Sequence, residues 1–444
     1  MGELRPTQQA ANFNDRRGAE ILAAGRWLHP EHREATGRFA SGLRCILAAT
    51  AGDALNKVVS YSNLSTRRLA IGNLTLAEAI LLMLAWSTAQ EPARAAFGDR
   101  ITVSGSQFTA GADRIWINGA NTPWHVWNEF GGQFDPGWWD NHLRQLHENG
   151  INATRVWISC NGEVGININS AGQVSGCTPA FWTNLDSLFQ IARQRQVYIK
   201  ATLISFDHFS NSHQHYLGWR HMLTDSGNID SLVTNYVVPF AIRYRDNPWL
   251  WSIDLCNEPD WIYENEKCGR IPWEWIQTYV ARAAAAIHAN SQILVTVDVC
   301  MGPKYTARPP GSNIVSDQAL QARVRGDARA RLDFDSPHYY DWEHVLRGNP
   351  FYQTPAAYGL ETNKPIVIGE CPAKGTANHT VAEDYEAACT NGWQGVMAWT
   401  SNGVDSNGGL SDLTPATRAL RDKHKRLVFP GEPGATPGHS SDSH

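Results

Sequence analysis

The chain has 444 residues, of which 42% are hydrophobic, and a formal net charge of −5. This length suffices for one large domain or two ordinary ones, and a charge this small, without basic stripes, argues against a surface for nucleic acid or membranes. The 18 Trp residues are more than a core usually absorbs, so we expect some to line a surface on which sugar rings stack. Packing beneath long loops is the alternative for any single Trp.

The N-terminal part of the chain differs from the rest. Residues 1–66 are rich in Ala and Arg without a sustained strand or helix period, and in residues 67–96 an Arg pair precedes an apolar run from Ala79 to Trp86 and then small residues. This is the order of a secretory signal peptide, and the apolar run is too short to span a bilayer. We therefore predict that translation starts near residues 58–69 and that residues 1–66 are spurious. The alternative is a genuine helical extension.

The eight Cys residues contain no CxxC pair, which argues against a zinc ribbon or a thioredoxin-like site. In an exported protein disulfides form, and the best candidate pair is Cys160 with Cys177, which bracket one loop rich in Gly, Asn and Ser. Without export, all eight are expected to be ordinary thiols.

From Ile101 the sequence becomes regular. Short strands with Gly turns in "ITVSGSQFTAGADRIWING" predict a β-hairpin before the main domain. Eight apolar runs then alternate with amphipathic stretches, which predicts a parallel sheet with connecting helices. The expected strands are Arg114–Asn118, Ala153–Ile158, Val197–Ile204, Leu250–Leu255, Ile293–Val299, Leu332–Ser336, Pro365–Gly369 and Gly395–Trp399. The expected helices include Trp138–Asn149, Thr183–Arg195, Trp273–Ala289, Val381–Asn391 and a last one over Pro415–Leu427.

The fold class predicted from this alternation is α/β, a (β/α)8 TIM barrel over residues 101–428 with an N-terminal β-hairpin. Eight such units fit a barrel whose typical size is about 250 residues plus insertions. A doubly wound open sheet is the runner-up, but it would need a Gly-rich phosphate turn after the first strand, and "NGANTPW" provides none. The tail, residues 429–444, has no periodic apolar residue and is predicted to be disordered.

Two predicted strands end in carboxylates. The fourth ends in Asn257-Glu258-Pro259 and the seventh in Glu370, and active residues of such barrels lie at the C-terminal strand ends. Two carboxylates facing across a cleft suit glycosidic bond cleavage, in which one donates a proton and the other, ionised, attacks or activates water. Arg155 and Tyr340, if they reach Glu370, would lower its pKa and leave Glu258 as the acid.

On these residues the chain from about 101 to 428 resembles a clan A glycoside hydrolase, most closely glycoside hydrolase family 5, the cellulase and mannanase family. The strand-four Asn-Glu-Pro and the "VIGE" ending at Glu370 match its two motifs. Its strand-two arginine, strand-six His-x-Tyr and strand-eight tryptophan are matched by Arg155, by His338 to Tyr340, and by Trp399. The resemblance implies a retaining double displacement with Glu258 as acid/base and Glu370 as nucleophile, carboxyl groups roughly 5–5.5 Å apart, and no metal or organic cofactor.

The sequence departs from the family pattern after strand three. Many relatives carry Asp-x-His there, whereas Asp207 and His208 are adjacent in this chain, so which of them faces the cleft stays open. The predicted substrate-binding residues are Arg155, Asn257, His208, His338, Tyr340, Trp399, Trp261 and Trp124. For each of them a structural role, such as an ion pair, a core histidine or ring packing, is the alternative.

The resemblance implies a β-1,4-linked polysaccharide or oligosaccharide as substrate, mannan or glucan, and the opening hairpin and "NGAN" lean towards the mannanase-like branch. We expect a secreted or periplasmic monomer that binds no nucleic acid and, in mature form, no membrane. Two alternatives remain: a metal-dependent barrel hydrolase using His208, His213 and His215, and a non-catalytic carbohydrate-binding barrel.

Overall fold

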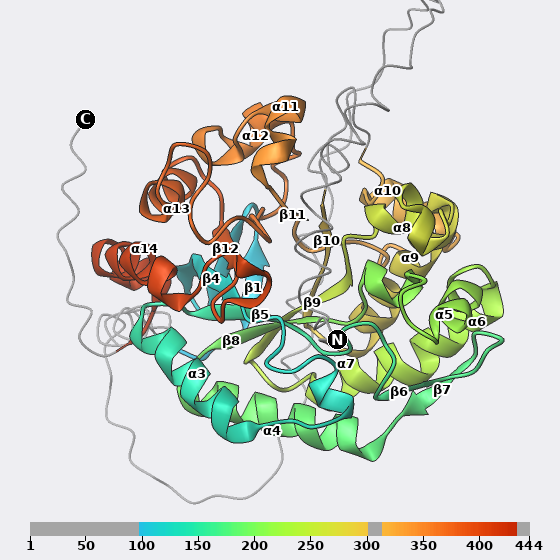
Figure 1. The fold of residues 1–444 in the computed structure, drawn as a ribbon. Coiled ribbons are helices and arrows are strands. Elements are labelled where there is room, and N and C mark those ends of the chain that lie inside the picture. Colours follow the sequence, from blue (N-terminus) through green and yellow to red (C-terminus); the bar gives the residue numbers. More distant parts are fainter. Residues whose placement is uncertain (1–96, 301–312, 433–444) are drawn as a thin grey trace, which may run out of the picture. The chain divides into compact units, whose positions relative to one another are not determined.

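A parallel sheet forms the centre of the structure, which is a computed structural model describing residues 97–300 and 313–432. The sheet has seven strands in the order β11-β10-β9-β8-β5-β4-β12. They are β4 (Ile117–Asn121), β5 (Ala153–Trp157), β8 (Tyr198–Thr202), β9 (Leu250–Asn257), β10 (Leu294–Val299), β11 (Ser336–Pro337) and β12 (Gly395–Trp399). Figure 1 shows helices lying around the outside of these strands.

The segment around Glu370 closes the sheet into a barrel. On one side it makes parallel bridges between Asp335 and Ile366 and between His338 and Glu370. On the other side Ile368 and Pro372 bridge to Val396 and Trp399 of β12. The seventh predicted strand, which ends at Glu370, is therefore present as isolated bridges. The predicted (β/α)8 barrel is confirmed, and the open sheet is not.

The helices connect consecutive strands, as expected for a barrel of this type. The α-helices are α3 (Pro136–Glu148), α4 (Pro179–Arg195), α5 (Tyr216–Leu223), α6 (Ser226–Leu232), α7 (Val238–Tyr244), α8 (Asp260–Glu264), α9 (Trp273–Asn290), α10 (Asp317–Arg323), α11 (His344–Arg347), α12 (Pro355–Tyr358), α13 (Val381–Thr390), α14 (Leu410–Lys423) and α15 (Lys425–Val428). Short helical turns are η1 (Glu129–Gly131), η2 (Phe206–Phe209), η3 (Val233–Val237), η4 (Glu266–Cys268), η6 (Asp341–Glu343), η7 (Pro350–Tyr352) and η8 (Val404–Ser406). The start of α13 shows how sequence sets a boundary: Thr380 accepts from the Glu383 N–H while Glu383 accepts from the Thr380 N–H, which is a capping box.

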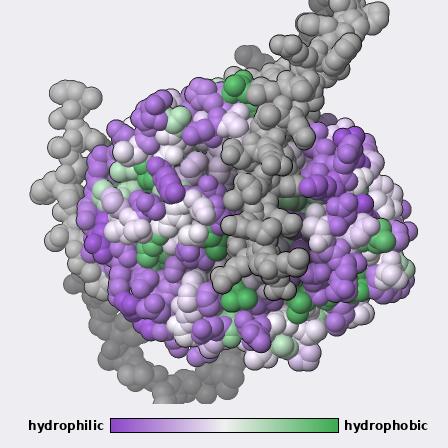
Figure 2. Space-filling view, viewed as in Figure 1, coloured by the Kyte–Doolittle hydropathy of each residue, from purple (hydrophilic) through white to green (hydrophobic). Residues whose placement is uncertain are grey.

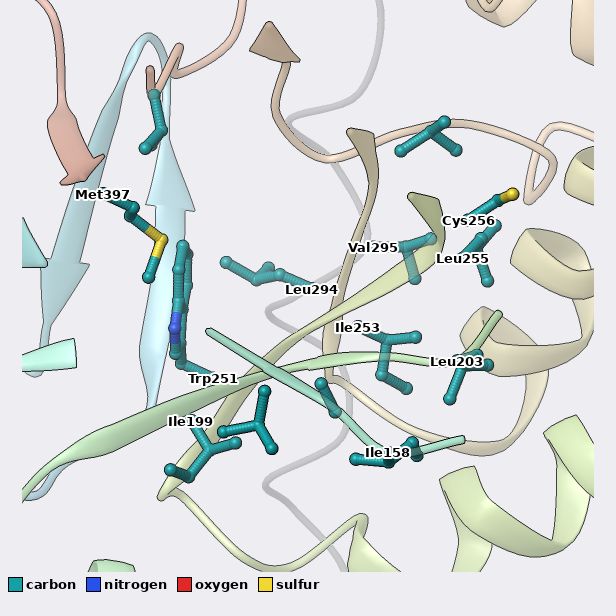
Figure 3. Packing of buried hydrophobic residues seen from close by; sticks show 14 of the residues in the cluster. Ile158, Ile199, Leu203, Trp251, Ile253, Leu255, Cys256, Leu294, Val295 and Met397 are labelled. Carbon is teal, nitrogen blue, oxygen red and sulfur yellow. The ribbon is translucent and has the colours of Figure 1, made fainter. Parts of the chain in front are cut away.

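A small antiparallel sheet covers the N-terminal end of the barrel strands. It has three strands, β1 (Ile101–Ser104), β2 (Gln107–Ala110) and β3 (Asp113–Ile115), one more than the predicted hairpin. Phe108 packs edge-on against Trp251, near the start of β9, with ring centroids 5.5 Å apart. Figure 3 shows Trp251 among the buried residues contributed by neighbouring barrel strands. Because this end is filled by side chains, the opposite, C-terminal ends of the strands are left for a site.

The first predicted strand, Arg114–Asn118, is wrong in its boundaries. It straddles β3 and β4, because the chain leaves the small sheet at Trp116 and enters the barrel at Ile117. The apolar residues Ile115, Trp116 and Ile117 are all buried, so burial alone gives no sign of the change of sheet.

The loop after β10 contains residues 301–312, which lie outside the described residues, as do the predicted extension 1–66 and the signal-like segment 67–96.

The disulfide predicted between Cys160 and Cys177 is not formed, and both are free thiols. Cys160 is buried and its Sγ accepts the Asn128 N–H at 3.2 Å. Cys177 ends β7 (Val174–Cys177), where it lies opposite Ile166 of β6 (Ile166–Ile168). The loop that joins the two cysteines is thus organised by its own hairpin instead.

The C-terminal boundary predicted at residue 429 is also too early. Phe429 is 1% exposed, and its ring packs against that of Phe97 with centroids 5.0 Å apart.

On the face shown in Figure 2, the described surface is mostly hydrophilic and its hydrophobic residues are scattered. Between residues 97 and 432, leaving out 301–312, no helix has the length and apolar composition needed to cross a membrane.

Candidate active site

The two carboxylates singled out in the sequence lie together at the C-terminal ends of the strands. Glu258 follows β9 directly, and Glu370 lies in the segment that closes the barrel; they are 7% and 4% exposed. One oxygen of each and a ring nitrogen of His338 all lie within 4.8 Å of one another. Inverting glycosidases need carboxyl groups about 6.5–9.5 Å apart and retaining ones about 5–5.5 Å. The short separation therefore fits the retaining geometry and not the inverting one.

The backbone at Glu258 is held in an unusual conformation. Its φ is 45°, in the left-handed region that non-glycine residues seldom adopt. Its N–H donates to the Asp298 carbonyl at 2.6 Å, and Pro259 follows, which has no N–H to continue the ladder. Strand β9 thus stops at the residue whose side chain joins the carboxylate pair. Such conformations persist where surrounding structure enforces them, and they concentrate at functional sites.

Glu370 is held at both oxygens. Arg155 donates from Nη1 to Oε1 at 2.6 Å, and the Tyr340 hydroxyl donates to Oε2 at 2.9 Å. The neighbouring Tyr339 instead points its hydroxyl towards His344. Arg155 and Tyr340 both lower the pKa of Glu370, as predicted, but burial outweighs them and raises the pKa of Glu370 to about 7. Burial has the larger effect because the carboxyl is almost completely removed from water.

His338 lies between the two carboxylates. Its Nδ1 is 3.0 Å from Glu258 Oε1 and 3.4 Å from Glu370 Oε2. Burial lowers the pKa of His338, but Glu370, Asp298 and Glu258 together raise it to about 10. The ring thus lies where a proton on it would offset part of the repulsion between the two acids.

Arg155 was predicted to bind substrate, and its placement contradicts that role. Its side chain is 0% exposed, and its five N–H groups are all taken up by protein oxygens. Besides Glu370, they contact Asp254 Oδ2 at 2.9 Å, Asp298 Oδ2 at 2.7 Å, Asn257 Oδ1 at 2.6 Å and Asn121 Oδ1 at 3.1 Å. No N–H of Arg155 therefore remains for a ligand. Its contacts instead fix the orientation of Glu370 and Asn257 from beneath the site.

Three charged residues beneath the site were missed from the sequence. Lys200 on β8, Asp254 on β9 and Asp298 on β10 are all 0% exposed, and Lys200 Nζ is 2.6 Å from Asp298 Oδ1. Each stands alone in an apolar strand: "VYIKATLI", "LWSIDLC" and "ILVTVDV". Since charged residues are almost never fully buried unless paired, those isolated charges were the signal that they face one another inside the barrel.

His208 was predicted as a substrate ligand, and the structure places it in the interior. It is 0% exposed; Nδ1 accepts the Ser205 N–H at 3.1 Å, and Nε2 lies 3.1 Å from Ser159 Oγ. Asp207 accepts from the Ser205 hydroxyl at 2.8 Å. Both ring nitrogens contact protein atoms and the ring has no exposed surface. His208 therefore stabilises the loop instead of binding a ligand.

The three histidines proposed for a metal site do not gather as ligands. His213 Nε2 is 2.8 Å from the His208 carbonyl, and both His208 nitrogens are engaged. Among the described residues, the side chains that gather like a metal-ligand set are Glu258, His338 and Glu370. There the protonated His338 ring and the Arg155 guanidinium supply positive charge already, which disfavours a metal cation because neutral imidazole is the ligand form.

An aromatic cluster borders the carboxylates. Trp124, Trp157 and Trp399 are each 5% exposed, and the Trp399 ring lies 5.5 Å from Trp157 and 6.1 Å from Trp124. Tyr340 packs against this cluster. Trp157 was missed, although it stands at the end of the second barrel strand, where site residues are expected. Trp261 lies apart, on α8, 4% exposed and 6.4 Å from the ring of Trp342.

Gly369, beside Glu370, allows three site elements to approach. A Cβ there would lie 2.4 Å from Ser336 Oγ, 3.1 Å from His338 Cδ2 and 3.2 Å from Asp298 Oδ2. These distances are below ordinary van der Waals contact, so any side chain would push His338 and Asp298 apart. The glycine of "VIGE" thus has a steric reason that its sequence context did not reveal.

Known proteins give two kinds of comparison. No protein-family model matches the chain. A curated mannan endo-1,4-beta-mannosidase from Mytilus edulis is 24% identical over 348 residues, 71% of this chain and 91% of the relative. One from Cryptopygus antarcticus is 24% identical over 355 residues, 73% and 90% of the two chains. The crystal structure of the Mytilus edulis beta-mannanase superposes with a TM-score of 0.65 at 20% identity, covering 75% of this chain and 99% of that one.

These relatives confirm the resemblance to family 5 glycoside hydrolases that the strand-end motifs indicated. The shared fold spans nearly the whole of the solved mannanase.

Proposed function

We propose that the protein is a retaining β-glycoside hydrolase that cleaves the β-1,4 linkages of mannan from within the chain. The observation that carries the proposal is the placement of Glu258 and Glu370, with oxygens within 4.8 Å of each other on the C-terminal ends of barrel strands. The names of the relatives support mannan as the substrate. Glucan is the second candidate, supported by the wider family resemblance.

In the first step Glu258 gives its proton to the glycosidic oxygen while Glu370 attacks the anomeric carbon, so that the C1–O bond breaks and a glycosyl–Glu370 ester forms. In the second step the Glu258 carboxylate takes a proton from water, whose oxygen attacks C1 and releases Glu370. Two contacts support this assignment of roles. Glu370 is held at both oxygens in one orientation, as a nucleophile requires, whereas Glu258 is held by His338 at Oε1.

We propose that substrate contacts come from the residues around this pair. The Asn257 amide, oriented through its Oδ1 by Arg155, donates to a sugar hydroxyl, and Trp399 and Trp124 offer ring surface to the sugar face. His338 and Tyr340 border the sugar at the cleaved bond, and Trp261 serves a more distant sugar unit. A polymeric substrate that cannot enter a cell fits a secreted or periplasmic monomer, in line with the signal-like segment.

A reducing-sugar assay on mannan, carboxymethyl cellulose, xylan and mixed-linkage glucan tests the function. We expect release from mannan, with Glu258→Gln inactive and Glu266→Gln, a surface carboxylate in an exposed ion pair with Arg270, fully active. Activity should persist after chelator treatment, whereas a metal hydrolase would lose it. Unchanged activity in Glu258→Gln would refute the assignment, and a protein that binds mannan without releasing sugars would be a non-catalytic binder.

Replacing Gly369 by Ala is expected to lower kcat by about 10²-fold, since displacement of reacting groups by about 1 Å costs that much. The added Cβ would meet Ser336 Oγ at 2.4 Å and displace His338. Gly409→Ala is the matched control, because a Cβ there has no neighbour closer than 3.8 Å. Thermal unfolding of both variants checks that the fold is intact. Equal kcat in Gly369→Ala and wild type would show that the close approach has no role.

A further inference from the structure

Asp298 contacts the two basic side chains, Arg155 and His338, that in turn contact Glu370 and Glu258. Its Oδ2 lies 2.7 Å from Arg155 Nε and 3.4 Å from His338 Nε2. Arg155 donates onward to Glu370, and His338 Nδ1 contacts Glu258. A single carboxylate thus touches both cations that hold the two acids.

The main chain of Asp298 serves the same pair. Its carbonyl accepts the N–H of Glu258 at 2.6 Å, at the residue with positive φ. Its side chain is fixed from the other side by Lys200 Nζ, at 2.6 and 2.8 Å from the two oxygens. Gly369 leaves the space in which the Asp298 carboxylate and the His338 ring can approach.

We propose that Asp298 is a positioning residue that keeps His338 protonated on both ring nitrogens, so that the imidazolium bridges Glu258 and Glu370. Nδ1 lies 3.0 Å from Glu258 Oε1, and Nε2 lies 3.4 Å from Asp298 Oδ2, a charge contact longer than a good hydrogen bond. Together they set the orientation of the ring and the charge between the acids. This inference rests on the proposed function, in which Glu258 changes from acid to base between the two steps while Glu370 stays the nucleophile.

The surroundings of His338 favour the cation. Glu258 and Glu370 face Nδ1, and Asp298 faces Nε2. The buried Glu343 of η6 also interacts electrostatically with His338, and the Tyr340 hydroxyl donates to Glu370 Oε2. Burial works against ionisation of Asp298, but Lys200 and Arg155 hold its pKa well below the usual range. A permanent anion at Nε2 therefore retains the second proton on the ring.

The test reads the His338 ring directly, by nitrogen NMR of histidine-labelled protein without substrate. The His338 signals are assigned as those absent from His338→Gln. In wild type we expect both ring nitrogens to be protonated at pH 8; a neutral ring would overturn the proposal. In Asp298→Asn the pH at which His338 loses its proton should fall by about one to three units, the usual effect of one nearby opposite charge.

Asp254→Asn is the matched control. Asp254 is equally buried and also pairs with Arg155, but the structure gives it no contact with His338. An equal fall in Asp254→Asn would overturn the proposal, because it would show a general effect of removing a buried charge. If Asp298→Asn does not fold, Lys200→Met/Asp298→Asn restores the local charge balance and should show the same fall.

The pH profile of kcat/KM on mannan distinguishes a positioning role of Asp298 from a purely structural one. In Asp298→Asn we expect the alkaline loss of activity to move to lower pH together with the His338 titration. A ring that titrates earlier with an unchanged profile would overturn the positioning role. Since the NMR arm needs no substrate, a protein with the expected ring protonation but no hydrolysis would refute the proposed function alone.

Discussion

Replacing Glu370 by Gln is expected to lower kcat on mannan by about 10⁴- to 10⁶-fold, the range seen when a nucleophile or its partner is removed. The amide keeps the volume of the carboxyl but has no charge to attack the anomeric carbon. Glu266→Gln, on an exposed surface carboxylate, should change nothing. Initial rates of sugar release, with the unfolding transition as a check on folding, decide the matter.

The same experiment on Glu258 should give a different pattern, because its task is proton transfer, which contributes about 10²- to 10⁴-fold. On mannan, Glu258→Gln should lose activity in that range. On an aryl glycoside with a good leaving group, departure needs no proton, so the first step should survive and the covalent intermediate should accumulate as a burst. A burst in Glu370→Gln and none in Glu258→Gln would mean that Glu370 is the acid/base and Glu258 the nucleophile.

Replacing Arg155 by Met is expected to lower the free energy of unfolding by about 3–5 kcal/mol, the cost of breaking a buried ion pair from one side. The change leaves Asp254, Asp298 and Glu370 without the cation that all three contact. Arg144→Met is the control, since its pair with Glu148 is 39% and 52% exposed and such pairs contribute about 0–1 kcal/mol. Denaturant titration of both variants measures the difference.

Arg155→Met should also move the acid limb of kcat/KM to higher pH. The nucleophile must be ionised, and burial already raises the pKa of Glu370 to about 7. Arg155 lowers this pKa, so its removal raises the pKa further, and the carboxylate form is lost at a higher pH as the solution is acidified. An acid limb that stays in place would show that Arg155 acts on stability alone.

Much of the architecture could be read from local pattern. Apolar runs alternating with amphipathic stretches predicted the barrel, and the polar residues that end those runs predicted where Glu258 and Glu370 would lie. Both inferences depend on period and position along the chain, which a sequence displays. Strand ends converge in a barrel whatever its details, so the site could be located before its geometry was known.

The errors arose where contacts made only in the folded chain decide the outcome. Arg155 and His208 have side chains suited to a ligand, but both are fully buried and satisfied by protein atoms. Cys160 and Cys177 flank one loop, yet each packs with its own neighbours. In each case the residue type was compatible with two roles, and only the contacts made in the folded chain chose between them.

The sequence by itself determined the order of strands and helices and the residue types at the strand ends, because hydrophobic periodicity is local. Only the tertiary structure decided that Asp298, Lys200 and Asp254 meet beneath the site and that His338 lies between Glu258 and Glu370. The pKa of Glu370 is likewise raised because burial outweighs the nearby positive charges. Closing the barrel brings charges from neighbouring strands together in a buried space, and their balance exists only after it closes.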